Sequence, residues 1–149
     1  MGLFGNSKPT PTVNGITLDQ AQVVIDAARD KAEGIGVPMN IAVVDAGANL
    51  TAFARMDGAW LGSIDIAVSK AKTARSFDMT SEALGAMSQP GEPIFGINTT
   101  NAGKVVIFGG GIPLVRDGVI VGAIGVSGGL VPQDIEVAEA GASAFDDQT

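Results

Sequence analysis

Apolar residues recur at helical spacing near the start of the chain. Thr17 and Gln20 stand three residues apart, the spacing of a capping box, in which each side chain accepts a hydrogen bond from the other residue's backbone N–H. The apolar positions that follow are Ala21, Val24, Ile25, Ala28 and Ala32. Their spacing of three or four residues predicts a first helix, which Gly34 ends.

The next segments predict a hairpin and two further helices. Asn40 to Ala46 and Leu50 to Met56 are short, apolar and partly alternating, and three residues typical of turns separate them. A helical pattern then runs from about Leu61 to Phe77. Thr80 is a favourable N-cap, so we expect it to begin a short third helix that ends near Met87.

The second half of the chain begins with a long loop and continues with three predicted strands. Ser88 to Lys104 is rich in proline and glycine, and loops of this length in compact domains are usually functional or mobile. The predicted strands are Val105 to Phe108, Ile112 to Arg116, and Val119 to Val126. Asp117-Gly118 separates the last two and favours a type I′ hairpin turn, in which both central residues have positive φ.

A last helix is predicted from Pro132, a favourable first helical residue, to about Phe145. The order is therefore helix, two strands, two helices, three strands and helix. Strands joined by tight hairpins and bracketed by helices are typical of an α+β fold with an antiparallel sheet. We predict a flexible N-terminal arm over residues 1–14, one domain over residues 15–146 and a tail over residues 147–149.

Composition and charge then limit the chemistry. The chain has 149 residues, a formal net charge of −7 and a pI near 4.3, which argues against a nucleic-acid partner. It contains no cysteine, histidine or tyrosine, so a disulfide framework, a thiolate nucleophile and the commonest metal ligands are excluded. Carboxylates, Lys, Arg, Ser, Thr and backbone amides remain, and we predict no metal site.

The sequence also bears on location. Residues 1–12 lack the charged and long apolar regions of a secretory signal. The longest apolar stretch, Val105 to Val115, is interrupted by three glycines and Pro113, so we expect no membrane-spanning segment. These observations predict a cytoplasmic protein without membrane contact.

Lys70 is the most informative candidate site residue. The polar stripe of the second predicted helix does not include it, and its side chain is expected to face the protein beside Ile66 and Ala74. One interpretation is a lysine whose stem follows apolar surface until its ammonium reaches water or a carbonyl. The other is an ammonium on the floor of a pocket, where it binds a carboxylate or acts as a base.

Two glycine-rich turns are candidates for ligand binding. One spans Gly125 to Gly129 before the last helix, where exposed amides attract anions, and the other is Gly109-Gly110-Gly111. Turns or bulges that simply require glycine explain both segments equally well. The candidate substrate-binding residues are Ser127, Gly125, Gly128, Gly110, Gly111 and Asp134.

Three further charged residues complete the candidate catalytic set with Lys70. Asp45 closes an apolar strand and by default binds the amides of the next turn, while Glu92 lies in the long loop with no evident structural role. Arg55 follows the second strand and is able to pair with an acid or bind a substrate carboxylate. Asp134 would by default act as a charge in the first turn of the last helix.

Five segments of the chain form a pattern when taken together: Ile41 to Gly47, Arg55 to Gly58, Ala67 to Ala74, Gly109 to Leu114 and Gly122 to Gly128. In this order they resemble the GlcG/HbpS-like family, over roughly Ile16 to Phe145. The family includes haem-binding proteins and the C-terminal domain of the corrinoid adenosyltransferase PduO. The resemblance implies a profilin-like five-stranded antiparallel sheet flanked by helices, assembly into dimers up to octamers, and pocket roles for Lys70, Ser127 and Asp134.

The resemblance also bears on cofactors. Haem binding in such proteins usually needs an axial histidine, and this chain has none. Methionine is the remaining side-chain type in the sequence that binds haem iron, and Met39, Met56, Met79 and Met87 are present. We therefore predict no cofactor, with haem disfavoured.

These observations support three functional hypotheses. The first is a cytoplasmic homo-oligomer that binds a small organic acid in a pocket between the sheet, the second helix and the Ser88–Lys104 loop. Lys70 and the amides near Ser127 would bind the anionic group of this acid. With Glu92 or Asp45 as base, it would be a cofactor-free isomerase, lyase or hydratase in a catabolic pathway. The alternative is a haem- or corrinoid-binding accessory protein without catalysis. The third is a purely structural oligomer.

Overall fold

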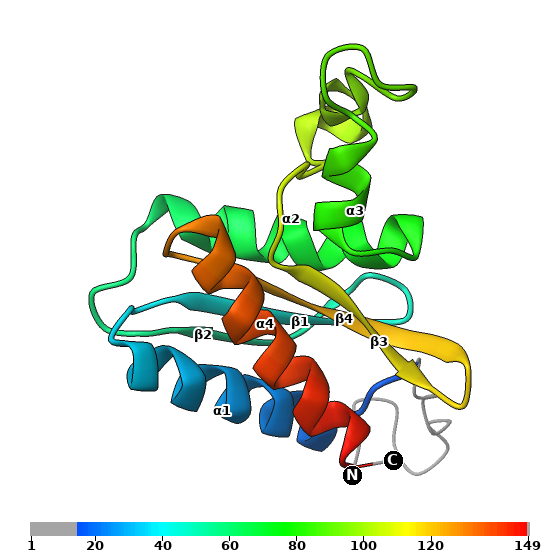
Figure 1. The fold of residues 1–149 in the computed structure, drawn as a ribbon. Coiled ribbons are helices and arrows are strands. Elements are labelled where there is room, and N and C mark those ends of the chain that lie inside the picture. The colour runs from blue at the N-terminus through cyan, green and yellow to red at the C-terminus, as the bar shows by residue number, and fades with distance from the viewer. Residues whose placement is uncertain (1–14, 149) are drawn as a thin grey trace, which may run out of the picture.

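The structure is a computed structural model that describes residues 15–148. The arm predicted for residues 1–14 and the last residue of the predicted tail lie outside the described residues. Within them, a four-stranded antiparallel sheet carries helices on both faces (Figure 1). The predicted α+β class with an antiparallel sheet is confirmed.

The sheet is built from two hairpins that meet in its centre. β1 (Asn40–Asp45) pairs with β2 (Leu50–Arg55), β3 (Gly111–Arg116) pairs with β4 (Val119–Ser127), and β1 and β4 pair with each other, giving the order β2-β1-β4-β3. Asp117 and Gly118 both have positive φ, at 51° and 76°, as the predicted type I′ turn requires. The sequence therefore located both hairpins correctly.

Each face of the sheet packs against different helices. α1 (Leu18–Ile35) and α4 (Val131–Asp146) cover one face, where they enclose the larger core with inward side chains such as Ile41 and Ile124. α2 (Gly62–Phe77) covers the opposite face, and its alanines pack against Ala42, Val44 and Ala123. The alternation of side chains along β1 thus separates two cores.

The N-termini of two helices follow the signals seen in the sequence, whereas α1 continues past Gly34 to Ile35 and is capped by Gly36, which has φ of 73°. The predicted capping box at Thr17 and Gln20 forms, because Gln20 N–H donates to Thr17 Oγ1 at 3.2 Å and Thr17 N–H donates to Gln20 Oε1 at 3.0 Å. Thr80 Oγ1 accepts a hydrogen bond from Ala83 N–H at the start of α3 (Ser81–Ala86). In the described part of the chain, no helix is long and apolar enough to cross a membrane.

The five-stranded sheet implied by the family resemblance is wrong for this structure, because the run Val105 to Phe108 forms no strand and the predicted element order contains one strand too many. The segment lies along α2 instead, where Val106 N–H donates to Thr73 Oγ1 at 3.0 Å. A short apolar run is able to pack against a helix as well as to pair in a sheet, and the apolar pattern alone does not distinguish the two arrangements.

The long loop predicted from Ser88 to Lys104 projects from the body of the molecule together with α3 (Figure 1). It consists of short turns and two 3-10 turns, Ile97–Thr99 and Asn101–Gly103, held by local backbone hydrogen bonds. The last residues of the loop lie beside α2, the helix that carries Lys70.

Candidate functional site

The Lys70 side chain lies between α2, β4 and α4 and is completely buried. Its Nζ donates to the backbone oxygen of Val126 at 2.8 Å and to Asp134 Oδ2 at 2.9 Å. α2 approaches the sheet this closely because Gly125 has no side chain, and a Cβ there would overlap the backbone oxygen of Ala67. The sequence-based expectation that Lys70 faces the protein is confirmed.

Asp134 uses both carboxylate oxygens. While Oδ2 accepts from Lys70, Oδ1 accepts from Gly129 N–H at 2.9 Å, and Gln133 Oε1 accepts from Leu130 N–H at 2.9 Å. An ammonium and a helix-terminal amide are the two donors that the sequence analysis assigned to a ligand's anionic group. In the structure, the carboxylate of Asp134 occupies this position.

The glycines of the 109–111 segment allow the chain to pass directly over Lys70. Gly110 has φ of 124°, and a Cβ there would lie 2.5 Å from the Val126 oxygen and 2.8 Å from Lys70 Nζ. Gly111 N–H donates to Ser81 Oγ at 2.9 Å, which ties α3 to the start of β3. Gly110, Gly111 and Asp134 therefore lie against Lys70, and Gly125 lies against Ala67 and Ala71 of the same helix. Their predicted substrate-binding roles stay predictions.

The environment of Lys70 changes its proton affinity. Burial lowers the pKa of the Lys70 ammonium below its ordinary value, and the hydrogen bond and negative charge of Asp134 offset part of that effect. Because the ammonium bonds to Val126 of β4 and to Asp134 of α4, Lys70 links α2 to both of these elements.

Phe108 connects this buried cluster to the surface. Lys70 Nζ lies over the Phe108 ring, 5.0 Å from its centroid, and 43% of Phe108 is exposed. The sequence does not single out Phe108 as a site residue, because the apolar run that contains it has the pattern of a strand. Ser81 was also missed, since a serine after a helix cap gives no signal of a partner 30 residues away.

Phe108 also lines a cavity of about 340 Å³ between α2 and the 98–108 segment. The apolar part of its wall consists of Ile66 on α2 and the run Val105, Val106, Ile107 and Phe108. The polar part consists of Asp65, Ser69, Asn98, Gly103 and Lys104. Lys104 Nζ lies 3.4 Å from Asp65 Oδ1, and both side chains are largely exposed, so the rim is open to solvent.

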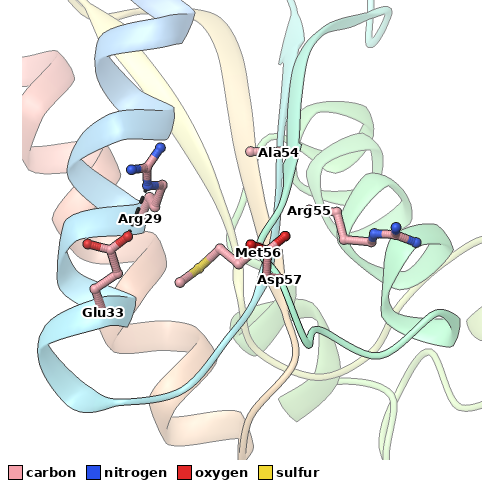
Figure 2. A pocket seen from close by; sticks show the side chains of 6 residues that line it. All are labelled: Arg29, Glu33, Ala54, Arg55, Met56 and Asp57. Carbon is pink, nitrogen blue, oxygen red and sulfur yellow. Dashed lines mark hydrogen bonds and ion pairs between the residues drawn. The ribbon is translucent and has the colours of Figure 1, made fainter.

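A second cavity, of about 400 Å³, lies between α1 and the end of β2. It is bordered mainly by charged side chains, and the ion pair between Arg29 Nε and Glu33 Oε1 at 3.1 Å crosses one side of it. Figure 2 shows Met56 pointing toward α1 and Arg55 extending away from it. Arg55 therefore borders this cavity without pointing at the Arg29–Glu33 pair.

The other predicted catalytic residues lie at separate places. Asp45 Oδ1 accepts hydrogen bonds from Gly47 N–H and Asn49 N–H in the β1–β2 turn, the default role expected of it. Arg55 pairs in register with Asn40, so it lies at the other end of the same hairpin. Glu92 is exposed on the projecting loop. Among the described contacts, none joins any two of Lys70, Asp45, Arg55 and Glu92, and their catalytic roles stay a prediction.

Ser127 and Gly128 lie where β4 ends. Ser127 is buried opposite Asn40 of β1, and a Cβ on Gly128 would lie 2.8 Å from the Pro38 oxygen. Asn40 Nδ2 donates to the Trp60 oxygen at 2.9 Å, whereas its buried Oδ1 has no hydrogen-bond partner among the described residues. The binding roles predicted for Ser127 and Gly128 stay predictions.

Comparison with known proteins identifies the family. The model of a family described as "Haem degrading protein HbpS-like" matches residues 16–143. The chain belongs to the HbpS-like family. This confirms the resemblance found in the sequence, which spans nearly the same residues.

HbpS-like relatives differ in length and description. An uncharacterized 15.0 kDa protein from the dhaT-dhaS intergenic region of Citrobacter freundii is 41% identical over 130 residues, which cover 87% of this chain and 92% of that protein. The corrinoid adenosyltransferase PduO of Salmonella typhimurium is 36% identical over 140 residues, which cover 94% of this chain and 41% of PduO. This HbpS-like chain thus matches less than half of PduO.

Solved structures agree with this HbpS-like assignment. The crystal structure of Klebsiella pneumoniae protein ORFY has a TM-score of 0.87 and 37% identity, covering 93% of this chain and 96% of that one. The structure of a PduOC–haem complex has a TM-score of 0.84 and 35% identity, covering 87% of this chain and 94% of that one.

Proposed function

We propose that this protein is a binding protein for a tetrapyrrole of the haem or corrinoid class, and that the cavity between α2 and the 98–108 segment holds it. The proposal is supported by the haem complex of a relative with 35% identity and by the family's description. The single observation that carries it is the apolar wall of this cavity, formed by Ile66 and the run Val105 to Phe108.

The wall has the chemistry that a flat macrocycle needs. Ligand sites are mostly apolar with a few placed polar groups, and a volume of about 340 Å³ lies within the usual range of about 300–1,000 Å³. The exposed part of the Phe108 ring offers an aromatic surface for stacking. Lys70 holds that ring from inside the protein, so the aromatic surface is in place before a ligand arrives.

The rim favours a haem-type ligand over a corrinoid. Haem carries two carboxylates on its periphery, and Lys104 is a cation on the wall of the cavity. In a chain of net charge −7, such a cation offsets the general repulsion of an anionic ligand. The residues present therefore fit the macrocycle and its acidic side chains. They do not fit the iron, because the cavity wall contains no methionine and the chain no histidine.

A binding role is favoured over the isomerase, lyase or hydratase hypothesis. The candidate catalytic residues share no described contact, and the Lys70 ammonium already donates hydrogen bonds to Val126 and Asp134 inside the protein. A small organic acid as ligand, a homo-oligomer and a cytoplasmic location stay predictions alongside the proposal.

The experiment is a titration of the purified protein with haem and with cobalamin, followed by the visible spectrum and by quenching of the single tryptophan, Trp60. Ile66→Glu places a negative charge in the apolar wall, where it disrupts apolar contact and repels the carboxylates of haem. We expect it to weaken haem binding by about tenfold or more, since about 1.4 kcal/mol of lost contact is enough for that factor.

Ile64→Glu is the matched control. Ile64 is half-buried on the same helix but does not line the cavity, so the variant changes the same residue type and charge without changing the wall. We expect its haem affinity to stay within about twofold of the wild type. The proposal is wrong if the wild type takes up neither ligand in a defined ratio, or if the two variants bind equally well.

A further inference from the structure

The amino-acid content of this chain conflicts with ligation of a haem iron. Proteins hold that iron through histidine, cysteine thiolate, methionine or tyrosine, and this sequence contains no histidine, cysteine or tyrosine. The remaining candidates of those types are methionines. Because a relative's domain is seen with haem, the conflict has a direct consequence for what the site recognises.

The described methionines are not placed to act as ligands in the cavity. Met39 is fully buried in the larger core, and Met56 packs beside it with its Sδ accepting from Met39 N–H at 3.3 Å. Met79 and Met87 flank α3, and neither contributes to the cavity wall. The sulfur atoms of these four residues thus lie elsewhere than the proposed site.

The polar residues of the wall are no better suited to iron. Lys104, as an ammonium, donates hydrogen bonds and has no lone pair for a metal, and Asp65 is its partner at 3.4 Å. Ser69 and Asn98 offer a hydroxyl and an amide, which are not the side chains that proteins use for haem iron. What the wall does offer is apolar contact and the paired charges of Lys104 and Asp65.

We infer that the cavity between α2 and the 98–108 segment recognises the apolar face and the acidic side chains of a tetrapyrrole and forms no bond to its metal. This inference rests on the proposed function. Its ligand class is a porphyrin with carboxylate side chains whether or not it contains iron. Metal-free and metal-bearing porphyrins then compete for one site on equal terms.

The test is to titrate the 149-residue chain at pH 7 with protoporphyrin IX, zinc protoporphyrin IX and haem, each followed by Trp60 quenching. We expect the three dissociation constants to agree within about threefold, and Ile66→Glu to weaken all three to the same extent. Imidazole added to the haem complex is expected to shift its visible spectrum, because no side chain of the cavity wall would compete with imidazole for the iron.

Methionine is tested separately with the Met79→Leu/Met87→Leu variant, in which the two swaps keep side-chain volume nearly constant. We expect its haem spectrum and haem affinity to match the wild type. The inference is overturned if haem binds more than about tenfold tighter than protoporphyrin IX with a spectrum that imidazole leaves unchanged, or if this variant alters the haem spectrum. In both cases the proposed function stands, whereas failure of all three porphyrins to bind removes both.

Discussion

Lys70 Nζ and Asp134 Oδ2 lie 2.9 Å apart in the interior of the protein, where the Lys70 side chain is fully buried and that of Asp134 is 4% exposed. The two residues are 64 positions apart in the sequence and join α2 to the first turn of α4. A carbonyl oxygen of β4 and an amide of the Gly125 to Gly129 turn complete their hydrogen bonds. The pair therefore fixes the end of β4 between two helices.

Removal of one residue of the Lys70–Asp134 pair is expected to lower the free energy of unfolding. Lys70→Met leaves the Asp134 carboxylate buried without its cation, and a broken buried ion pair costs about 3–5 kcal/mol of the free energy of unfolding. Urea-induced unfolding of the wild type and of Lys70→Met at pH 7 measures this loss of stability directly.

The double variant Lys70→Met/Asp134→Asn is the control. It removes the unpaired charge but keeps an oxygen that accepts from Gly129 N–H. We expect it to be more stable than Lys70→Met alone. If the double variant is equally unstable, the cost comes from lost packing around the lysine stem and not from the ion pair.

The sequence predicted the half of this arrangement that depends on local pattern. The helical spacing showed that Lys70 points inward, and the glycine-rich turns marked where the backbone approaches it. The sequence did not identify Asp134 as the partner of Lys70, because no local pattern distinguishes a ligand's carboxylate from that of Asp134. Either carboxylate is able to accept hydrogen bonds from the Lys70 ammonium and from Gly129 N–H.

The incorrect fifth strand has a similar cause. Val105 to Phe108 is an apolar run of strand length after a loop, and nothing in it indicates that its neighbour is α2. The same error hid the cavity wall and Phe108. The hairpins were predictable because their turns need particular residues at particular positions, as Asp117 and Gly118 show.

Gly125 sets the distance between α2 and β4. Gly125→Ala would force a methyl group into the Ala67 backbone and close to Ala71. Such overpacking typically costs about 1–3 kcal/mol of stability, so we expect a lower urea midpoint. Gly34→Ala in α1 is the matched control, since nothing lies within 4 Å of its Cβ position. That variant should gain about 0.5–1 kcal/mol from helix propensity, and a loss there of the size seen for Gly125→Ala would contradict this explanation.

Lys104 is expected to set the charge dependence of ligand binding. An exposed charge contact contributes up to about 1 kcal/mol, so Lys104→Gln should weaken haem binding by up to about fivefold at low salt. The difference from the wild type should shrink as salt is added, because salt screens exposed charges. Isothermal titration at two salt concentrations measures both effects.

Lys31→Gln is the control for Lys104. Lys31 is an exposed lysine on α1, across the sheet from the cavity, and it forms a surface pair with Glu136 at 3.1 Å. Its removal changes net charge by the same amount, so an equal loss of haem affinity in both variants would show an effect of overall charge and not of a contact at the rim.

The buried lysine also predicts how stability changes with pH. Burial lowers the pKa of Lys70 in the folded protein below its ordinary value of 10.5, which the unfolded chain regains. Between these two pKa values the unfolded chain carries a proton on Lys70 that the folded protein has released. The free energy of unfolding therefore rises with pH through this interval and levels off above 10.5. The measurement is urea unfolding of the wild type and of Lys70→Met from pH 7 to pH 11, because their difference cancels the other titrating groups. We expect the wild type's advantage over the variant to grow with pH, and an advantage that stays constant or declines would mean that Asp134, and not burial, dominates the pKa of Lys70.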